Sequence, residues 1–219
     1  MLDCVRDNKY NPSVSGAVPV SVGGNTLFWS VKRAADIAGS LMLLPFFLLA
    51  AVVLLLLNPF KNRGPLFFTQ TRMGRDCRPF EALKFRSMAV AVAIERGHDD
   101  PIEHHRITSL GRLMRKSRID ELPQILNVLK GEMSLLGPRP DYFPHAQAFL
   151  ECVPGYRERH CVRPGISGLA QVSLGYIEGS DATRAKVRKD LEYIQNVSIL
   201  TENQLVLKTI RTVFGRAGA

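Results

Sequence analysis

Cysteine is scarce in this 219-residue chain, and none of the four cysteines forms a C-x-x-C pair. The five histidines do not fall at metal-ligand spacing with the cysteines. A zinc site therefore has no support, and a secreted disulfide scaffold does not fit a chain of this length and spacing. We expect the working domain to lie in a reducing cytoplasm.

Acidic residues are outnumbered: 20 Asp and Glu face 29 Lys and Arg, which gives a net charge of +9. The segment 61–120 holds thirteen basic and seven acidic residues, a net charge of +6, whereas 1–60 and 121–219 carry +1 and +2. The middle segment therefore suggests an anionic partner, such as a nucleic acid, a phosphorylated small molecule or an anionic membrane surface. Simple solubility is the alternative. The chain has no internal repeat, and its hydrophobic content of 46% is enough for a sizeable core.

Charge is absent from the 21 residues Ile37 to Leu57, which contain one hydroxyl group, on Ser40. A helix of this length could cross a hydrocarbon core of about 30 Å. The segment is not a signal peptide, because it starts too late and no small-residue cleavage site follows it. A buried helix of a soluble protein is the less favoured alternative, since such helices rarely lack polar positions over this length.

Pro45, near the middle of this run, predicts a kink or a break. Both flanks of the run are basic, at Lys32, Arg33, Lys61 and Arg63. The positive-inside tendency places both ends on the cytoplasmic side. A helix broken at Pro45 that enters one leaflet and returns fits both observations. A tilted full span, with residues 1–30 outside, is the alternative that the residues leave open.

The local patterns divide the chain into a flexible tail at 1–27, an interfacial lead-in and membrane helix at 28–60, and a domain at 61–219. Alternation around Gly74 predicts a hairpin within 65–88. Periodicity or composition predicts helices at 109–118, 121–130, 181–197 and 201–214. The expected fold class is α+β, mostly helical.

Two proline-containing segments are predicted to be rigid loops: GPRP at 137–140 and PGISG at 164–168. Gly131 is expected to cap the helix before the first loop. The helix at 201–214 suits a position on a membrane surface, and packing onto the domain is the alternative.

Asp120 and Glu121 form the most informative pair in the basic segment. Pro123 favours the first turn of a helix, which would place both carboxyl groups at its N-terminus, where backbone N–H groups stabilise anions. Arg115 and Arg118 precede the pair and would keep Asp120 ionised. An ionised carboxylate can attack phosphorus or hold a divalent metal. An ordinary capping pair with surface arginines is the alternative.

Three further cations flank this pair in the sequence. Arg139 lies between two prolines, and its restricted freedom suits a bidentate phosphate contact, with a solvated turn arginine as the alternative. Lys84 and Arg86 alternate with Phe85 along an expected strand, for which a charged outer face is the commoner explanation. The concentration of these groups after a membrane segment favours phosphate binding.

The chain resembles the bacterial sugar transferases, small monotopic phosphoglycosyl transferases that use polyprenyl phosphate. The resemblance rests on KFRSM, DELPQ, NVLKGEMSL, GPRP and RPGISGLAQV in this order, and it covers about residues 28–214. In size and layout it is strongest to the members that start exopolysaccharide repeat units. The family's membrane helix is re-entrant and broken at a Ser-Pro pair. This chain has Leu44-Pro45 there, so re-entry is favoured while the angle at the break stays open.

The resemblance implies transfer of a sugar-1-phosphate from a UDP-sugar to undecaprenyl phosphate, with release of UMP. Asp120 would be the nucleophile that forms a covalent phosphosugar intermediate and holds Mg²⁺, and Glu121 would be its catalytic partner. The remaining family-matched or nearby cations are expected to bind phosphate or nucleotide: Lys84, Arg86, Arg115, Arg118, Arg139 and Arg163.

The resemblance also implies a cytoplasmic catalytic domain on the bacterial inner membrane, in contact with lipids and without nucleic acid. UDP-galactose or UDP-glucose is the expected donor, and a homo-oligomer is left open. Two other functions compete with the enzyme. A membrane-anchored nucleic-acid-binding protein would use the basic segment, although that segment has no recognisable motif. A catalytically inactive scaffold of a polysaccharide assembly complex is the other, and the intact Asp-Glu pair argues against it.

Overall fold

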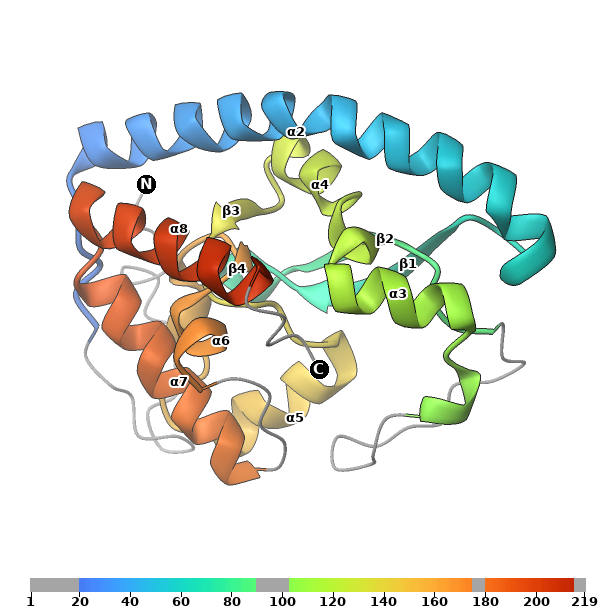
Figure 1. Ribbon diagram of the computed structural model, residues 1–219. Helices are drawn as coiled ribbons and strands as arrows, with labels where there is room; N and C mark the ends of the chain where they lie inside the picture. The colour runs from blue at the N-terminus through green and yellow to red at the C-terminus, as the bar shows by residue number, and fades with distance from the viewer. Residues whose placement is uncertain (1–19, 90–102, 175–179, 215–219) are drawn as a thin grey trace.

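The computed structural model describes residues 20–89, 103–174 and 180–214. In chain order its helices and strands are α2 (Thr26–Lys61), β1 (Phe67–Met73), η1 (Arg75–Cys77), β2 (Pro79–Phe85), η2 (His104–Arg106), α3 (Ser109–Ser117), η3 (Ile119–Glu121), α4 (Gln124–Lys130), β3 (Ser134–Leu136), α5 (Phe143–Cys152), η4 (Glu158–Cys161), β4 (Gly165–Ser167), α6 (Leu169–Leu174), α7 (Ser180–Gln195) and α8 (Ile199–Phe214). Figure 1 shows α2 arched along one side and α5 and α7 on the opposite side, with α3, α4, α8 and two small sheets between them. The mixed, mostly helical fold class is confirmed.

Helix α2 is one continuous helix of 36 residues. The Asn25 side chain caps it by accepting a hydrogen bond from Phe28 N at 2.8 Å. The predicted lead-in at 28–36 forms the first turns of this same helix. Pro45 lies inside it with an exposed ring, and the helix continues past this residue. Figure 1 shows α2 as one arched helix. A single proline removes one backbone hydrogen bond, which a helix with an otherwise intact ladder accommodates by bending.

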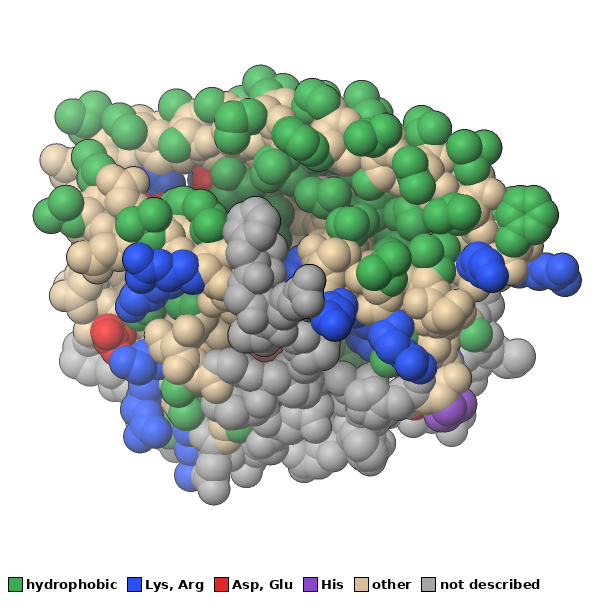
Figure 2. All heavy atoms as spheres, viewed as in Figure 1, with side chains coloured by type: hydrophobic (Ala, Val, Ile, Leu, Met, Phe, Trp, Pro, Cys, Tyr) green, Lys and Arg blue, Asp and Glu red, His purple; other side chains and the backbone are tan. Residues whose placement is uncertain are grey.

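The two faces of α2 differ in composition. The buried residues recur at spacings of four or seven and form one stripe against the domain: Lys32, Asp36, Ser40, Phe47, Leu54 and Asn58. The opposite face exposes large apolar side chains, including Met42 at 70% and Phe46 at 62% (Figure 2). Within the described ranges, α2 is the one helix long and apolar enough to cross a membrane.

The chain just before α2 is attached to α7. Gly23 N donates to Ile194 O at 2.9 Å, and a Cβ added at Gly23 would lie 2.6 Å from Gln195 O. This close approach requires glycine. The predicted flexible tail at 1–27 otherwise falls mainly on residues 1–19, outside the described residues.

The hairpin predicted within 65–88 is confirmed as the antiparallel pair β1–β2, which runs from Phe67 opposite Phe85 to Met73 opposite Pro79. Phe85 is buried and stacks on Phe47 of α2 at a centroid distance of 5.7 Å. The membrane helix and the hairpin therefore share one hydrophobic cluster, which Met114 and Ile125 extend into α3 and α4.

The second sheet joins segments far apart in the sequence. Strand β3 pairs in parallel with β4, with Ser134 opposite Gly165 and Leu136 opposite Ser167. PGISG, predicted as a rigid loop, is therefore partly a strand. A Cβ on Gly165 would lie 2.1 Å from Gly137 N, so the two glycines allow the backbones to approach closely.

Three predicted helices are confirmed as α3, α7 and α8. Thr108 caps α3 by accepting from Gly111 N at 2.9 Å. The predicted helix at 121–130 is shorter, because the turn η3 precedes α4, although α4 ends as expected at Gly131 with a φ of 91°. Helices α5 and α6 were not predicted. Helix α5 lies against β1, and residues from α5, α7 and α8 build the larger core.

Candidate active site

Asp120 and Glu121 lie in the turn η3, between α3 and α4. The chain reverses direction at Arg118, whose φ of 59° is in the left-handed region. That conformation costs a residue with a Cβ about 1–2 kcal/mol. The turn directs both side chains inward, where they are 6% and 7% exposed. Because α4 begins only at Gln124, this turn positions the pair and the predicted helix N-terminus does not.

Glu121 lies at the centre of a cluster of cations. Lys84 Nζ from strand β2 donates to Glu121 Oε1 at 2.9 Å. Arg139 from the GPRP loop donates from both terminal nitrogens to the two carboxylate oxygens, with Nη1 at 3.2 Å from Oε2. Burial raises the pKa of Glu121, but Arg139 and Lys84 outweigh it and hold this pKa well below its usual range. Glu121 is therefore ionised.

Asp120 is in a different environment from its neighbour. Its Oδ1 is buried and has no hydrogen-bond partner among the described residues. Burial raises its pKa and the charge of Glu121 adds to this, while Lys84, Arg115 and Arg139 act in the opposite direction. The charge of Arg115 lowers the pKa of Asp120 as expected, but burial and Glu121 outweigh it, and the short contacts of Lys84 and Arg139 go to Glu121. Adjacent carboxyl groups with divergent pKa values are typical of catalytic pairs.

The unpartnered Asp120 oxygen fits a bound divalent cation. A hard cation such as Mg²⁺ prefers oxygen ligands and is commonly held by one or two carboxylates together with substrate phosphates and water. No group of three or more His, Cys, Asp or Glu side chains gathers within the described ranges. The donor set therefore suits a metal shared with a phosphorylated substrate more than a closed structural site.

Arg72 is a cation of this site that the sequence patterns did not reveal. Its guanidinium, carried by β1, donates to Pro140 O in the GPRP loop and to Gln70 Oε1 at 2.9 Å. Burial and the neighbouring Arg139 lower its pKa to about 10, against the raising effect of Glu121. Arg72 also pairs with Tyr142 just after the GPRP loop, and this contact between distant segments follows from the tertiary fold rather than from any motif.

The backbone of the GPRP loop is fixed from two sides. Gly137 N donates to Ser167 O at 2.9 Å, and Gly165 N donates to Pro138 O at 2.9 Å. Arg159 Nη2 donates to Arg139 O at 2.8 Å. The PGISG segment thus supports the loop that carries Arg139.

Arg159 belongs to a second charged cluster behind the loop. It is 3% exposed and pairs with Asp141 and with Asp190, at 2.7 Å for the latter. Tyr156 donates from its hydroxyl to Asp141 Oδ2 at 2.7 Å. Burial would raise the pKa of Asp141, but Arg159 and Tyr156 hold it at about 2. Burial raises the pKa of Asp190 to about 6, although Arg159 lowers it. The charged groups of this cluster therefore pair with one another.

Of the other predicted site residues, Arg115 and Arg118 lie beside the Glu121 cluster, whereas Arg86 and Arg163 lie apart from it. Arg115 on α3 is half-buried and acts electrostatically on Asp120, while Arg118 Nη1 lies 3.8 Å from Glu121 Oε2 with 41% of its side chain exposed. Both lie beside the cluster.

Arg86 lies apart from that cluster. Its guanidinium donates to Pro65 O at 2.7 Å, to Met88 O at 3.0 Å and to Asn62 Oδ1 at 3.1 Å. These contacts tie the end of α2 to the end of β2. Arg163 also lies elsewhere, with Nε donating to Gly131 O at 2.8 Å behind α4. Neither side chain contacts Asp120 or Glu121 in the structure.

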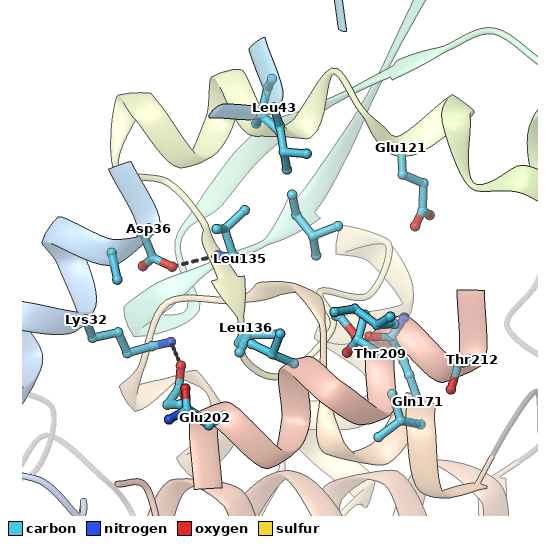
Figure 3. Close-up of a pocket in the computed structure, with 18 of the residues that line it drawn as sticks. Lys32, Asp36, Leu43, Glu121, Leu135, Leu136, Gln171, Glu202, Thr209 and Thr212 are labelled. Atoms are coloured by element: carbon cyan, nitrogen blue, oxygen red, sulfur yellow. Dashed lines mark hydrogen bonds and ion pairs between the residues drawn. The ribbon is translucent and has the colours of Figure 1, made fainter. Parts of the chain in front are cut away.

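Glu121 and Arg118 also line one end of a groove of about 530 Å³ between α2 and α8. Figure 2 shows a hollow beneath α2 whose visible walls are mostly hydrophobic. Figure 3 shows Glu121 at one end and the Lys32–Glu202 pair at the other. The cation cluster is thus reached from an apolar groove.

A family model described as bacterial sugar transferase matches residues 27–216. The chain is 37% identical over 190 residues to the exopolysaccharide production protein PSS of Rhizobium leguminosarum bv. phaseoli, covering 82% of this chain and 93% of that protein.

Two further relatives have names that state substrates. The UDP-N-acetylgalactosamine-undecaprenyl-phosphate N-acetylgalactosaminephosphotransferase of Aeromonas hydrophila is 43% identical over 192 residues, covering 86% of this chain and 45% of the relative. The UDP-glucose:undecaprenyl-phosphate glucose-1-phosphate transferase of Caulobacter vibrioides is 40% identical over 192 residues, covering 82% and 68%. The chain therefore spans less than half of the Aeromonas protein and about two thirds of the Caulobacter one.

Proposed function

The chain belongs to the bacterial sugar transferase family, and from this we propose that it transfers a sugar-1-phosphate from a UDP-sugar to undecaprenyl phosphate. The resemblance inferred from its motifs is confirmed, as is the expectation that it belongs to a family of enzymes. Relatives named for such transfers support the substrates, and they differ in the sugar, N-acetylgalactosamine in one and glucose in another. We propose a hexose donor, in keeping with the expectation of UDP-galactose or UDP-glucose.

The observation that carries the proposal is the buried Asp120 carboxyl, with one unpartnered oxygen, beside the Glu121, Lys84 and Arg139 cluster. In the first step an Asp120 oxygen attacks the sugar-linked phosphorus. The bond from that phosphorus to the oxygen of the UMP phosphate breaks, and UMP leaves with the electron pair. In the second step the acceptor phosphate oxygen attacks the same phosphorus and releases the Asp120 carboxylate.

The chain's own groups provide charge for both steps. Phosphoryl transfer places negative charge on phosphoryl oxygens, which guanidinium and ammonium groups stabilise. Arg139, Lys84 and Arg72 lie on three different segments and converge on this region. Mg²⁺, when bound, supplies further positive charge beside the phosphates, and Asp120 would hold it. Glu121 has a low pKa, which makes it a poor base, and we assign it to positioning Lys84 and Arg139.

A position on one face of the membrane follows from the contacts of α2. Near its start, Arg33 Nη1 donates to Val128 O at 2.7 Å, and Asp36 accepts from Leu135 N at 2.9 Å. At its end, Asn62 Nδ2 donates to Arg86 O at 2.7 Å. A full span would separate one of these ends from the domain. These contacts support a monotopic arrangement, re-entrant or in-plane. The basic residues at both ends of the apolar run support a position on the cytoplasmic face of the inner membrane.

UMP release tests the proposed function. The purified protein is incubated with a panel of UDP-sugars, undecaprenyl phosphate and Mg²⁺, and UMP is measured. We expect UMP with at least one sugar, dependence on Mg²⁺, and none from Asp120→Asn. Asp76→Asn, at an exposed carboxyl outside the site, is the matched control. Absence of UMP across a broad panel would favour the inactive scaffold instead.

The covalent route has its own measurement. With a donor radiolabelled in the sugar and no acceptor, label should remain on the denatured protein and should be lost from Asp120→Asn. Turnover without any retained label would indicate direct transfer between the substrates.

A further inference from the structure

We propose that the groove between α2 and α8 binds the polyisoprenyl chain of the acceptor, with the acceptor phosphate at the end formed by Arg118 and Glu121. This inference rests on the proposed function and assigns one substrate to a particular surface. The lining residues come from α2 and α8 along the sides and from α4, β3, β4 and α6 between them.

The chemistry of the lining favours a hydrocarbon chain. Most lining side chains are apolar, including Val31 and Leu43 of α2 and Val206 and Ile210 of α8. The charged residues at the far end already have partners. Lys32 Nζ donates to Glu202 Oε2 at 2.6 Å, and Tyr193 donates to Glu202 Oε1.

The remaining charged lining residue of α2 is also satisfied. Asp36 Oδ1 accepts from Ser134 Oγ and from Leu135 N, both at 2.9 Å. A nucleotide would need several polar partners for its base, ribose and phosphates. This end of the groove offers few, so its contents are expected to be apolar.

The catalytic end has the opposite character. Arg118 has 41% of its side chain exposed, and among the described residues its ion pair is a 3.8 Å contact with Glu121. The Arg118 guanidinium is therefore more available to an incoming anion than the Arg139 guanidinium, because both terminal nitrogens of Arg139 already donate to Glu121. A molecule with a phosphate at one end and a long hydrocarbon at the other matches this gradient.

Access from a bilayer is direct. Val31 on α2 is 48% exposed, and on α8 Ile199, Val206 and Ile210 are 61%, 41% and 46% exposed. The same side chains line the groove, so its rim is continuous with the apolar surface of α2 in Figure 2. A chain could pass from lipid into the groove without crossing water.

The length of the groove limits what it holds. On α2 the lining extends from Phe28 to Leu43, and on α8 from Ile199 to Thr212. At the helical rise this is roughly 20 Å along each helix. An extended undecaprenyl chain is longer, so the groove would hold the isoprene units next to the phosphate and leave the rest in the bilayer.

Matched substitutions test the groove by kinetics. Val206→Trp fills it, whereas Leu207→Trp changes a neighbouring exposed residue that does not line it. Ala35→Phe and Ala34→Phe form the same kind of pair on α2. We expect the groove variants to raise the KM for undecaprenyl phosphate about tenfold. The KM for the UDP-sugar and the thermal midpoint should match the controls. Equal acceptor KM values within both pairs would overturn the proposal.

A binding measurement separates this proposal from the proposed function. A farnesyl phosphate with a diazirine on its second isoprene unit is photolysed with the wild-type protein in the absence of donor, and labelled peptides are mapped. We expect label on α2 and α8. Undecaprenyl phosphate should displace this label, and dioleoyl phosphatidic acid should not. Label elsewhere, or equal displacement by phosphatidic acid, would refute the groove assignment even if UMP release is normal. Specific label without any turnover would refute the catalytic proposal alone.

Discussion

Around Glu121, three cations contact one carboxylate beside a second carboxyl group, whereas around Arg159 two carboxyl groups share one guanidinium. The first cluster has an excess of positive charge and opens onto a groove. The second is closed: Arg159 is 3% exposed and donates to Asp190, to Asp141 and to the carbonyl of Arg139. Arg139 joins them, because its side chain belongs to the first and its carbonyl is bound by the second. The difference indicates that the Glu121 cluster binds substrate and that the Arg159 cluster stabilises the loop that carries Arg139.

Removing Arg159 should have the largest effect, and it should act on stability. Arg159→Met leaves the buried Asp190 and the partly buried Asp141 without their cation, which should lower the free energy of unfolding by about 3–5 kcal/mol. The measurement is denaturant unfolding in detergent, with Arg157→Met, an exposed neighbour, as control. Equal stability of the two variants would mean that the second cluster does not support the fold.

Changing Arg139 should act on turnover instead. Arg139→Lys keeps the positive charge but loses the bidentate contact, so kcat/KM should fall about 100-fold. The thermal midpoint should stay close to that of wild type. Arg112→Lys on exposed α3 is the control for a surface arginine. A rate near wild type would place the phosphates away from the GPRP loop.

The pH dependence of the rate should distinguish the clusters further. Burial, together with Arg72 and Arg139, lowers the pKa of Lys84 to about 8, against the raising effect of Glu121. Lys84 is therefore charged below pH 8 and loses its proton above it. If the charged form binds phosphate, kcat/KM should decline about tenfold per pH unit above pH 8. Lys84→Arg, which stays protonated, should remove this decline. An unchanged profile in that variant would assign the decline to another group.

The smallest expected effect concerns acid stability. The pKa of Asp141 lies at about 2 in the folded protein, below its value in the unfolded chain. Its contribution is therefore present above about pH 4 and is lost as the pH falls towards 2. Asp141→Asn should cost about 1 kcal/mol at pH 7 and should flatten the change in unfolding free energy between pH 4 and 2. Parallel curves for the two proteins would contradict this.

Local structure was predictable wherever a turn or cap signal coincided with periodicity. The hairpin around Gly74 and the end of α4 at Gly131 depend on neighbours within a few residues. The β3–β4 pairing was not predictable, because it joins Ser134 to Gly165 and neither short segment shows a strand pattern.

The site was predictable to the extent that motifs carried it. Asp120, Glu121, Lys84 and Arg139 converge, and their separate motifs suggested as much. Arg72 was missed because its contact with the GPRP loop joins segments 68 positions apart, which no motif shows. Arg86 resembles Lys84 in sequence, two positions away, but its long side chain turns to the end of α2. The pKa direction at Asp120 depends on which carboxylate the cations contact, and residue spacing does not contain that information.

The charged residues near the start of helix α2 precede their partners in the order of synthesis. The hydrogen-bond partners of Arg33 and Asp36 lie about 95–99 positions later in the chain, and Glu202, the partner of Lys32, lies 170 positions later. Until then these charged groups lie next to an apolar segment that favours lipid, where an unpaired charge is costly. The nascent chain must therefore keep the start of α2 at the aqueous boundary until α8 has been made. Of these three contacts, the Lys32–Glu202 pair is the latest that can form, because it needs α8.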